Sequence, residues 1–110
     1  MIDWNRVHDL RDEIGAHEFA EVVELFLEEV EIEITALREK VPLDTLESRL
    51  HFLKGSALNL GFAQFCDMCQ AGETAASGGA AEHVDIGNIL ASYDVSKMVF
   101  LKGLKDMKAP

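Results

Sequence analysis

The chain has 110 residues, of which 48% are hydrophobic, and a formal net charge of -10 at pH 7. This length suits one domain over residues 1–110 with a single modest core, and it excludes a core plus a separate nucleotide-binding domain. The charge argues against nucleic acid and against a membrane of anionic lipid as partners, because both would repel the chain.

Most of the negative charge lies in residues 1–33, which hold 11 acids against Arg6 and Arg11. This stretch is either a solvated helix face or a surface that steers a basic partner. No apolar run approaches the roughly 20 residues that a membrane span needs. The N-terminus also lacks a basic flank followed by an apolar run, so we expect a cytoplasmic protein.

Apolar residues at spacings of three and four predict five helices. The first covers about 4–13, with Asp3 as its N-cap and Gly15 as its stop. The second covers about 16–40 and carries its glutamates away from one apolar stripe. Pro42 breaks this pattern and separates the second helix from the third.

The third helix is predicted over about 44–60, since Asp44 and Glu47 resemble a capping box and Gly61 supplies a left-handed stop. Its apolar residues alternate in steps of three and four, which is typical of a seam between packed helices. The seam consists of Leu43, Leu46, Leu50, Leu53, Ala57 and Leu60.

The fourth helix is predicted over about 62–77, where the small residues Gly72 and Ala76 should let a neighbouring helix approach closely. A last helix follows over about 84–106. Sustained period-two alternation is nearly absent, so strands are not expected. The predicted fold is all-α, an antiparallel up-and-down four-helix bundle with a short extra N-terminal helix laid across one end.

Cys66 and Cys69 form a lone C-x-x-C inside a helical pattern, without the preceding strand that a thioredoxin-like dithiol needs. A structural zinc site would need two more ligands, yet the histidines are scattered. We interpret at least Cys69 as a core residue and expect no metal, with a metal or redox site as the alternative. The histidines are His8, His17, His51 and His83.

His51 differs from the other histidines in its neighbours. At about 100° per residue it points roughly 120° away from the seam, toward solvent. Lys54 and Gly55 follow three and four residues later, so both adjoin it on the helix surface. A glycine inside a helix costs about 0.5–1 kcal/mol relative to alanine, which indicates that something bulky approaches there. A neutral imidazole is a competent nucleophile, and an ammonium group offsets the charge of a phosphoryl group.

A family motif matches this segment, which reads His51-x-Leu53-Lys54-Gly55-Ser56-Ala57-x-x-Leu60-Gly61. It resembles the core motif of histidine-containing phosphotransfer (HPt) domains of bacterial and fungal multistep phosphorelays. That motif is usually His-x-Leu-Lys-Gly-Ser-Ser or Ala-x-x-apolar-Gly. The resemblance covers residues 51–61, and elsewhere only helix pattern and size agree.

The resemblance implies that His51 accepts a phosphoryl group at Nε2 from an aspartyl phosphate on a response-regulator receiver domain, or from a (hybrid) histidine kinase. It then passes the group to another receiver aspartate in two-component signal transduction. The chain would be a carrier rather than an enzyme, with no ATP site and no cofactor of its own. The receiver would contribute the Mg²⁺. We expect a monomer, because one carrier needs one exposed face.

Two other interpretations stay open. One is an adaptor that binds receivers without being phosphorylated, and the other is the metal or redox bundle. A histidine-kinase dimerisation helix is disfavoured, because the chain lacks a His-Glu-x-x-x-Pro pattern.

Antiparallel geometry places Gln70 and Glu73 of the fourth helix beside His51, since they follow the turn glycine by about the distance at which His51 precedes it. In the family an amide or acid there commonly hydrogen-bonds the other ring nitrogen and fixes the tautomer, so Glu73 is the first candidate and Gln70 the second. Glu47, one turn before His51, could compete. The alternative for each is a solvated side chain.

A partner-docking patch is predicted around the histidine, where Phe52 and Asn59 project away from the seam and Leu58 lies on the other side. An aromatic residue on an otherwise polar face suits an interface. The alternative for Phe52 and Leu58 is packing against the first helix. Val22 and Leu25 would extend the patch.

Overall fold

The computed structural model describes residues 1–40 and 43–108. Five α-helices and one short 3-10 helix make up almost all of this part of the chain. Their bounds are Trp4–Ile14 for α1, Ala16–Glu39 for α2, Leu46–Leu60 for α3, Ala63–Ser77 for α4, Ala81–His83 for the 3-10 helix η1 and Ile86–Lys108 for α5.

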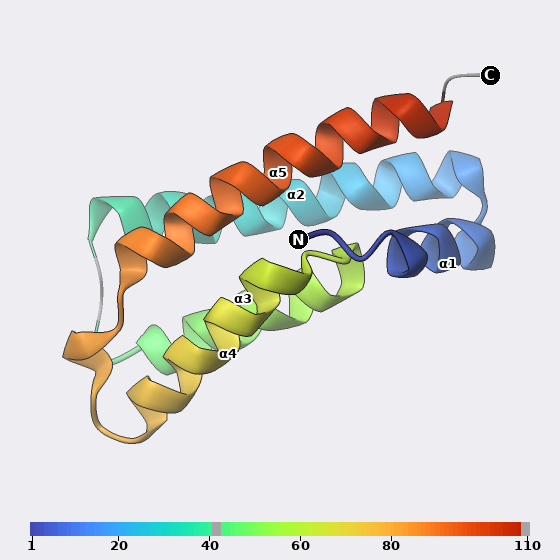
Figure 1. Cartoon of the computed structure of the whole chain (residues 1–110). Helices are drawn as coiled ribbons and strands as arrows, with labels where there is room; N and C mark the ends of the chain where they lie inside the picture. The colour runs from blue at the N-terminus through green and yellow to red at the C-terminus, as the bar shows by residue number, and fades with distance from the viewer. Residues whose placement is uncertain (41–42, 109–110) are drawn as a thin grey trace.

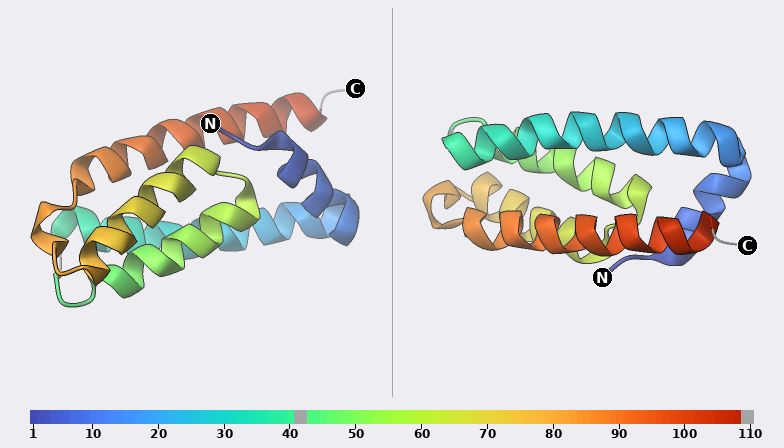
Figure 2. Two further views of the ribbon diagram at one scale, coloured as in Figure 1. Left: turned by 60° about the horizontal axis from the view of Figure 1, so that its bottom comes forward. Right: turned by 90° about the horizontal axis from the view of Figure 1, so that it is seen from above.

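Helices α2 to α5 form an antiparallel four-helix bundle, and α1 lies across the end at which α2 begins (Figures 1 and 2). The two long helices α2 and α5 make one side of the bundle, while the shorter hairpin of α3 and α4 makes the other (Figure 1). The predicted all-α class is confirmed.

Local signals at the N-terminus act as predicted. Asp3 Oδ1 accepts a hydrogen bond from the Arg6 backbone N–H at 3.2 Å and so caps α1. Gly61 adopts φ +79° at the end of α3, and a Cβ there would lie 2.7 Å from the Asp3 carbonyl oxygen. The Asp3 N–H donates to the Gly61 carbonyl at 2.6 Å, which ties the N-terminus to the turn between α3 and α4.

The predicted start of α3 is wrong. The N-cap is Thr45 rather than Asp44, and the helix begins at Leu46. Arg49 forms an ion pair with Glu33 of α2 at 2.8 Å and donates to Thr45 Oγ1 at 3.1 Å. These contacts set where the chain enters α3, and they outweigh the local pattern of a capping box.

Smaller differences affect other predicted positions. Leu43 precedes the helix and is exposed, so it does not belong to the seam. Pro42, the predicted break after the second helix, and Val41 before it lie outside the described residues. Helix α5 begins at Ile86 rather than 84, because Asp85 Oδ1 accepts from the Asn88 N–H at 3.0 Å and caps the helix there.

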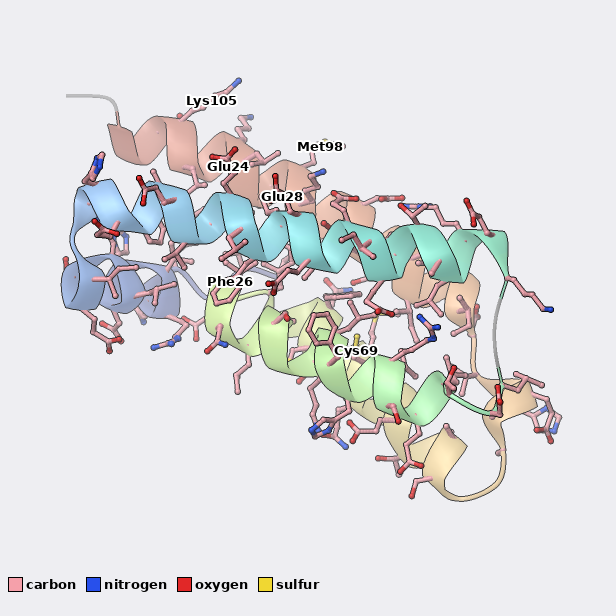
Figure 3. The ribbon with its side chains drawn as sticks, turned by 180° about the vertical axis from the view of Figure 1, so that it is seen from behind. Glu24, Phe26, Glu28, Cys69, Met98 and Lys105 are labelled. Carbon is pink, nitrogen blue, oxygen red and sulfur yellow. The ribbon has the colours of Figure 1, made fainter. Side chains whose placement is uncertain are left out.

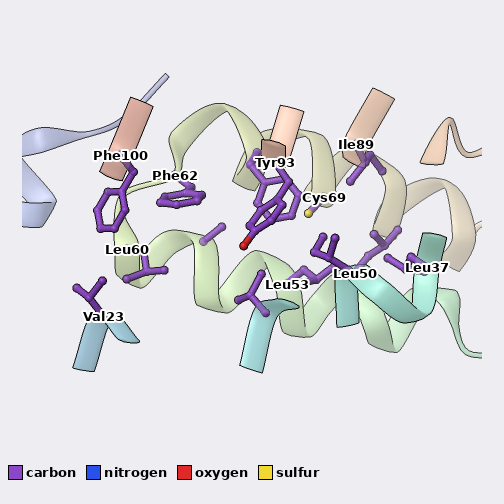
Figure 4. Close-up of a cluster of buried hydrophobic side chains, with 14 of the residues drawn as sticks. Val23, Leu37, Leu50, Leu53, Leu60, Phe62, Cys69, Ile89, Tyr93 and Phe100 are labelled. Atoms are coloured by element: carbon purple, nitrogen blue, oxygen red, sulfur yellow. The ribbon is translucent and has the colours of Figure 1, made fainter. Parts of the chain in front are cut away.

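The core lies between the α3 seam and aromatic residues from the other helices (Figure 4). Phe65 and Tyr93 pack with ring centroids 5.3 Å apart, and Phe26 of α2 lies between α2 and α3 (Figure 3). Trp4 stacks on Phe100 of α5 at 6.1 Å, which holds α1 against the bundle.

Candidate functional site

His51 stands on the outer face of α3, with its side chain 68% exposed. Its Nδ1 lies 2.8 Å from Glu73 Oε1 on α4. A carboxylate can only accept a hydrogen bond, so in the neutral imidazole Nδ1 must carry the proton. This arrangement leaves Nε2 with its lone pair free and directed away from Glu73.

Glu73 is the centre of a small polar network between α3 and α4. Its second oxygen, Oε2, lies 2.8 Å from Lys54 Nζ. Lys54 Nζ also donates to Gln70 Oε1 at 2.9 Å, and Gln70 Nε2 donates to Thr74 Oγ1 at 3.1 Å. The hydrogen bonds from Lys54 and then from His51 lower the pKa of Glu73 below its ordinary value. The carboxylate is therefore charged at neutral pH.

The structure separates the three residues considered as partners of the imidazole ring. Glu73 contacts the ring, Gln70 contacts Lys54 instead, and Glu47 is exposed. In the described part of the chain Glu47 makes no hydrogen bond or ion pair with His51. Lys54 is also less free than its sequence position indicates, because it is directed toward α4 with only 24% of its side chain exposed.

Gly55 faces open space, since no heavy atom lies within 4 Å of a Cβ built there. Nothing inside the described chain therefore requires a glycine at this position. Phe52, Leu58 and Asn59 are all exposed around it. Phe52 and Leu58 are thus accessible to a partner rather than covered by α1.

Leu58 also borders a hollow of about 180 Å³ between the starts of α1 and α4 and the end of α3. Arg6, Cys66 and Asp67 line other sides of it. On α2, Leu25 is exposed and Val22 is half-buried.

The link from Gln70 to Thr74 was not foreseen from the sequence. The two residues are four apart on α4 and so occupy one face of that helix, which is the signal that could have found the pair. Thr74 extends the network one turn beyond Gln70.

The two cysteines are both free thiols. Cys69 is buried in the core, and burial raises its pKa to about 12. Cys66 is half-buried, and burial raises its pKa as well. A thiol with a raised pKa is a poor nucleophile and a poor metal ligand. Across residues 1–40 and 43–108 no three His, Cys, Asp or Glu side chains are grouped so that they could hold a metal ion.

Comparison with known families gives one match, in which the model described as the Hpt domain covers residues 21–107. Neither the curated proteins nor the solved structures contain a match to the chain. Among the described helices none has the length and apolar character needed to cross a membrane.

Proposed function

The chain belongs to the Hpt domain family, whose members carry phosphoryl groups on histidine in phosphorelays, and we propose that it does so through His51. The hydrogen bond between His51 Nδ1 and Glu73 is the observation that carries this assignment. It fixes the tautomer in which the exposed Nε2 is the nucleophile.

Phosphoryl transfer to His51 needs no proton to move. The Nε2 lone pair forms a bond to phosphorus, while the bond from phosphorus to the receiver's aspartate oxygen breaks and its electron pair returns to that carboxylate. The ring keeps its Nδ1 proton and becomes positively charged beside the Glu73 carboxylate, which stabilises that charge. Onward transfer reverses these steps when the aspartate of a second receiver attacks.

Lys54 has a charge-balancing role in this scheme. A phosphoryl group on His51 brings negative charge close to Glu73, and Lys54, 2.8 Å from the Glu73 carboxylate, offsets both. Gln70 holds Lys54 in place from the other side at 2.9 Å. Glu73 and Gln70 are therefore positioning residues, whereas His51 is the group that reacts.

A receiver domain would dock over Gly55, where a Cβ would face open space, with Phe52, Leu58 and Asn59 around the contact. We assign the Mg²⁺ and the acidic pocket to the receiver, so the chain uses no cofactor of its own. A hybrid histidine kinase would be the source of the phosphoryl group through its own receiver. Both partners act in the cytoplasm, where we place this protein.

The test is incubation of the protein with a receiver charged by radiolabelled acetyl phosphate. The label should appear as acid-labile phosphohistidine, and His51→Gln should abolish it. The matched control is His8→Gln, because His8 is an exposed histidine on α1. If His51→Gln bound the receiver normally and wild type gained no label, the protein would be an adaptor instead.

Substitutions of Glu73 test the positioning role. Loss of a residue that orients a reacting imidazole typically lowers activity by about 10–100-fold. Glu73→Ala should show this loss, whereas Glu73→Gln can still accept the Nδ1–H bond and should retain more activity. Full activity of Glu73→Ala, or no rescue by Glu73→Gln, would remove Glu73 from the mechanism.

A further inference from the structure

The face formed by α2 and α5 lies on the side of the bundle opposite the hairpin of α3 and α4, and α3 carries His51 (Figure 1). This face exposes two large apolar side chains. Ile32 is 70% exposed on α2, and Met98 is 69% exposed on α5. A hollow of about 560 Å³ runs beside them, lined by Leu27, Glu31 and Lys97 among others. The groove between the two helices is therefore not filled by the chain's own side chains.

The two helices carry opposite charge. Helix α2 holds eight glutamates against one arginine, and α5 holds four lysines against two aspartates. Glu24 and Glu28 on α2 and Lys102 and Lys105 on α5 are all exposed. In the described structure these four side chains make no ion pair within the chain.

Contacts inside the chain set the register of the two helices. Glu31 forms an ion pair with Lys97 and accepts from Tyr93 Oη at 2.9 Å, while Arg38 pairs with Asp94 at 2.5 Å. The helices run antiparallel, so the first half of α2 lies beside the second half of α5. This register sets Ile32 level with Met98, Glu28 with Lys102 and Glu24 with Lys105. Figure 3 shows Glu24 and Lys105 toward the same end of the two helices.

Two copies can stack these faces in two symmetric ways. A two-fold axis across the helices would place α2 on α2 and α5 on α5, so glutamates would meet glutamates. A two-fold axis along the helices places α2 of one copy on α5 of the other at the same level. Only the second arrangement brings Glu24 and Glu28 to Lys105 and Lys102 and brings Ile32 to Met98.

We propose that this face binds a second copy of the chain, with α2 of each copy on α5 of the other. A helix of 24 residues is about 36 Å long, and two adjacent helices are about 20 Å wide, so each copy presents roughly 700 Å². The total of about 1,400 Å² falls within the range of stable interfaces. The acidic surface of residues 1–33 thereby has a basic partner, the α5 helix of the other copy.

The dimer leaves both His51 faces outward, because α3 and α4 lie on the opposite side of each bundle. The expectation of a monomer rested on the need for one exposed face, and each copy keeps that face. At physiological ionic strength the repulsion between two chains of charge -10 is screened beyond about 8 Å, whereas the facing pairs lie closer than that.

A complementary pair of charge reversals tests the proposal. The variant K102E/K105E carries acids on both helices, and E24K/E28K carries lysines on the outer face of both. Each should be a monomer alone in sedimentation equilibrium, because like charges then meet in both contacts. An equimolar mixture of the two should regain the mass of a dimer, since every contact again joins opposite charges.

The matched control is E47K/D67K, which makes the same charge change at two exposed acids of α3 and α4, on the other side of the bundle from the proposed contact. It should dimerise like wild type. The substitution Met98→Ser should shift the wild-type equilibrium toward monomer by removing the apolar contact with Ile32. Wild type that stays monomeric at every concentration, or two variants that do not rescue each other, would overturn the proposal. Receiver-dependent labelling of His51 would be unaffected by either result.

Discussion

Replacing Gly55 with alanine is expected to stabilise the free protein and to slow phosphotransfer. Alanine is favoured over glycine inside an exposed helix by about 0.5–1 kcal/mol. No heavy atom lies within 4 Å of the added Cβ, so no steric cost offsets this gain. For a domain of this size the melting temperature should rise by about 2–6 °C.

Gly72 provides the opposite case on α4. A Cβ there would lie 2.8 Å from Leu50 Cδ1, 3.2 Å from Val84 Cγ1 and 3.3 Å from Ile89 Cδ1. Overpacking of this kind costs about 1–3 kcal/mol, which exceeds the gain in helix propensity of about 1 kcal/mol. Gly72→Ala should therefore lower stability by up to about 2 kcal/mol in urea unfolding.

The expected effect of Gly55 substitutions on phosphotransfer is tested with a series of side chains of increasing size at position 55. Alanine, glutamine and arginine should slow transfer from a phosphorylated receiver in that order, because each fills more of the space above the helix. Thermal unfolding of each variant separates this effect from loss of the fold. A lower melting temperature for Gly55→Ala, or a wild-type transfer rate for Gly55→Arg, would refute the view that this glycine provides clearance for a partner.

Three further predictions concern the network, the cysteines and the turn. Lys54→Met should raise the pKa of Glu73 toward its ordinary value of 4.5, because the hydrogen bond from Lys54 is the main cause of its lowering. In wild type, the contribution of the Glu73 carboxylate to the free energy of unfolding should disappear as pH falls from 4.5 through the lowered pKa. The variant should lose less over the same range. NMR titration of Glu73 would give its pKa, and urea unfolding at each pH would give the free energy. Iodoacetamide should label Cys66 before Cys69 in the folded protein, and faster labelling of Cys69 would contradict its burial. Gly61→Ala should lower the free energy of unfolding in urea by about 2 kcal/mol or more. The alanine would have to adopt a left-handed backbone conformation, and its Cβ would lie 2.7 Å from the Asp3 carbonyl oxygen. A smaller loss would show that the turn relaxes.

The elements could be predicted from the sequence where their causes are local. Asp3 and Gly61 act on backbone groups within a few residues, and the apolar seam of α3 repeats along one helix. The start of α3 could not be predicted in this way. Asp44 fits a local cap, but Arg49 binds Glu33 on another helix and fixes the entry to α3 by a tertiary contact.

The proximity of Glu73 to His51 follows from counting residues on either side of a turn, which requires only that α3 and α4 pack antiparallel. The direction of Lys54 does not follow from such counting. A lysine side chain has many rotamers of similar energy, so its partner is chosen by the acceptors nearby, here Glu73 and Gln70. The sequence placed Lys54 beside His51 but did not reveal that its ammonium group binds two side chains of α4.

The geometry of the site also depends on a core contact that has no chemistry of its own. Gly72 directly precedes Glu73 and allows Leu50, which directly precedes His51, to lie against α4. A larger residue at 72 would hold α3 and α4 further apart at the level of the candidate site. The 2.8 Å separation between His51 Nδ1 and Glu73 Oε1 would then lengthen unless both side chains moved. A buried glycine thus sets the distance on which the tautomer of an exposed histidine depends, so core packing and the proposed nucleophile are coupled through neighbouring residues on two helices.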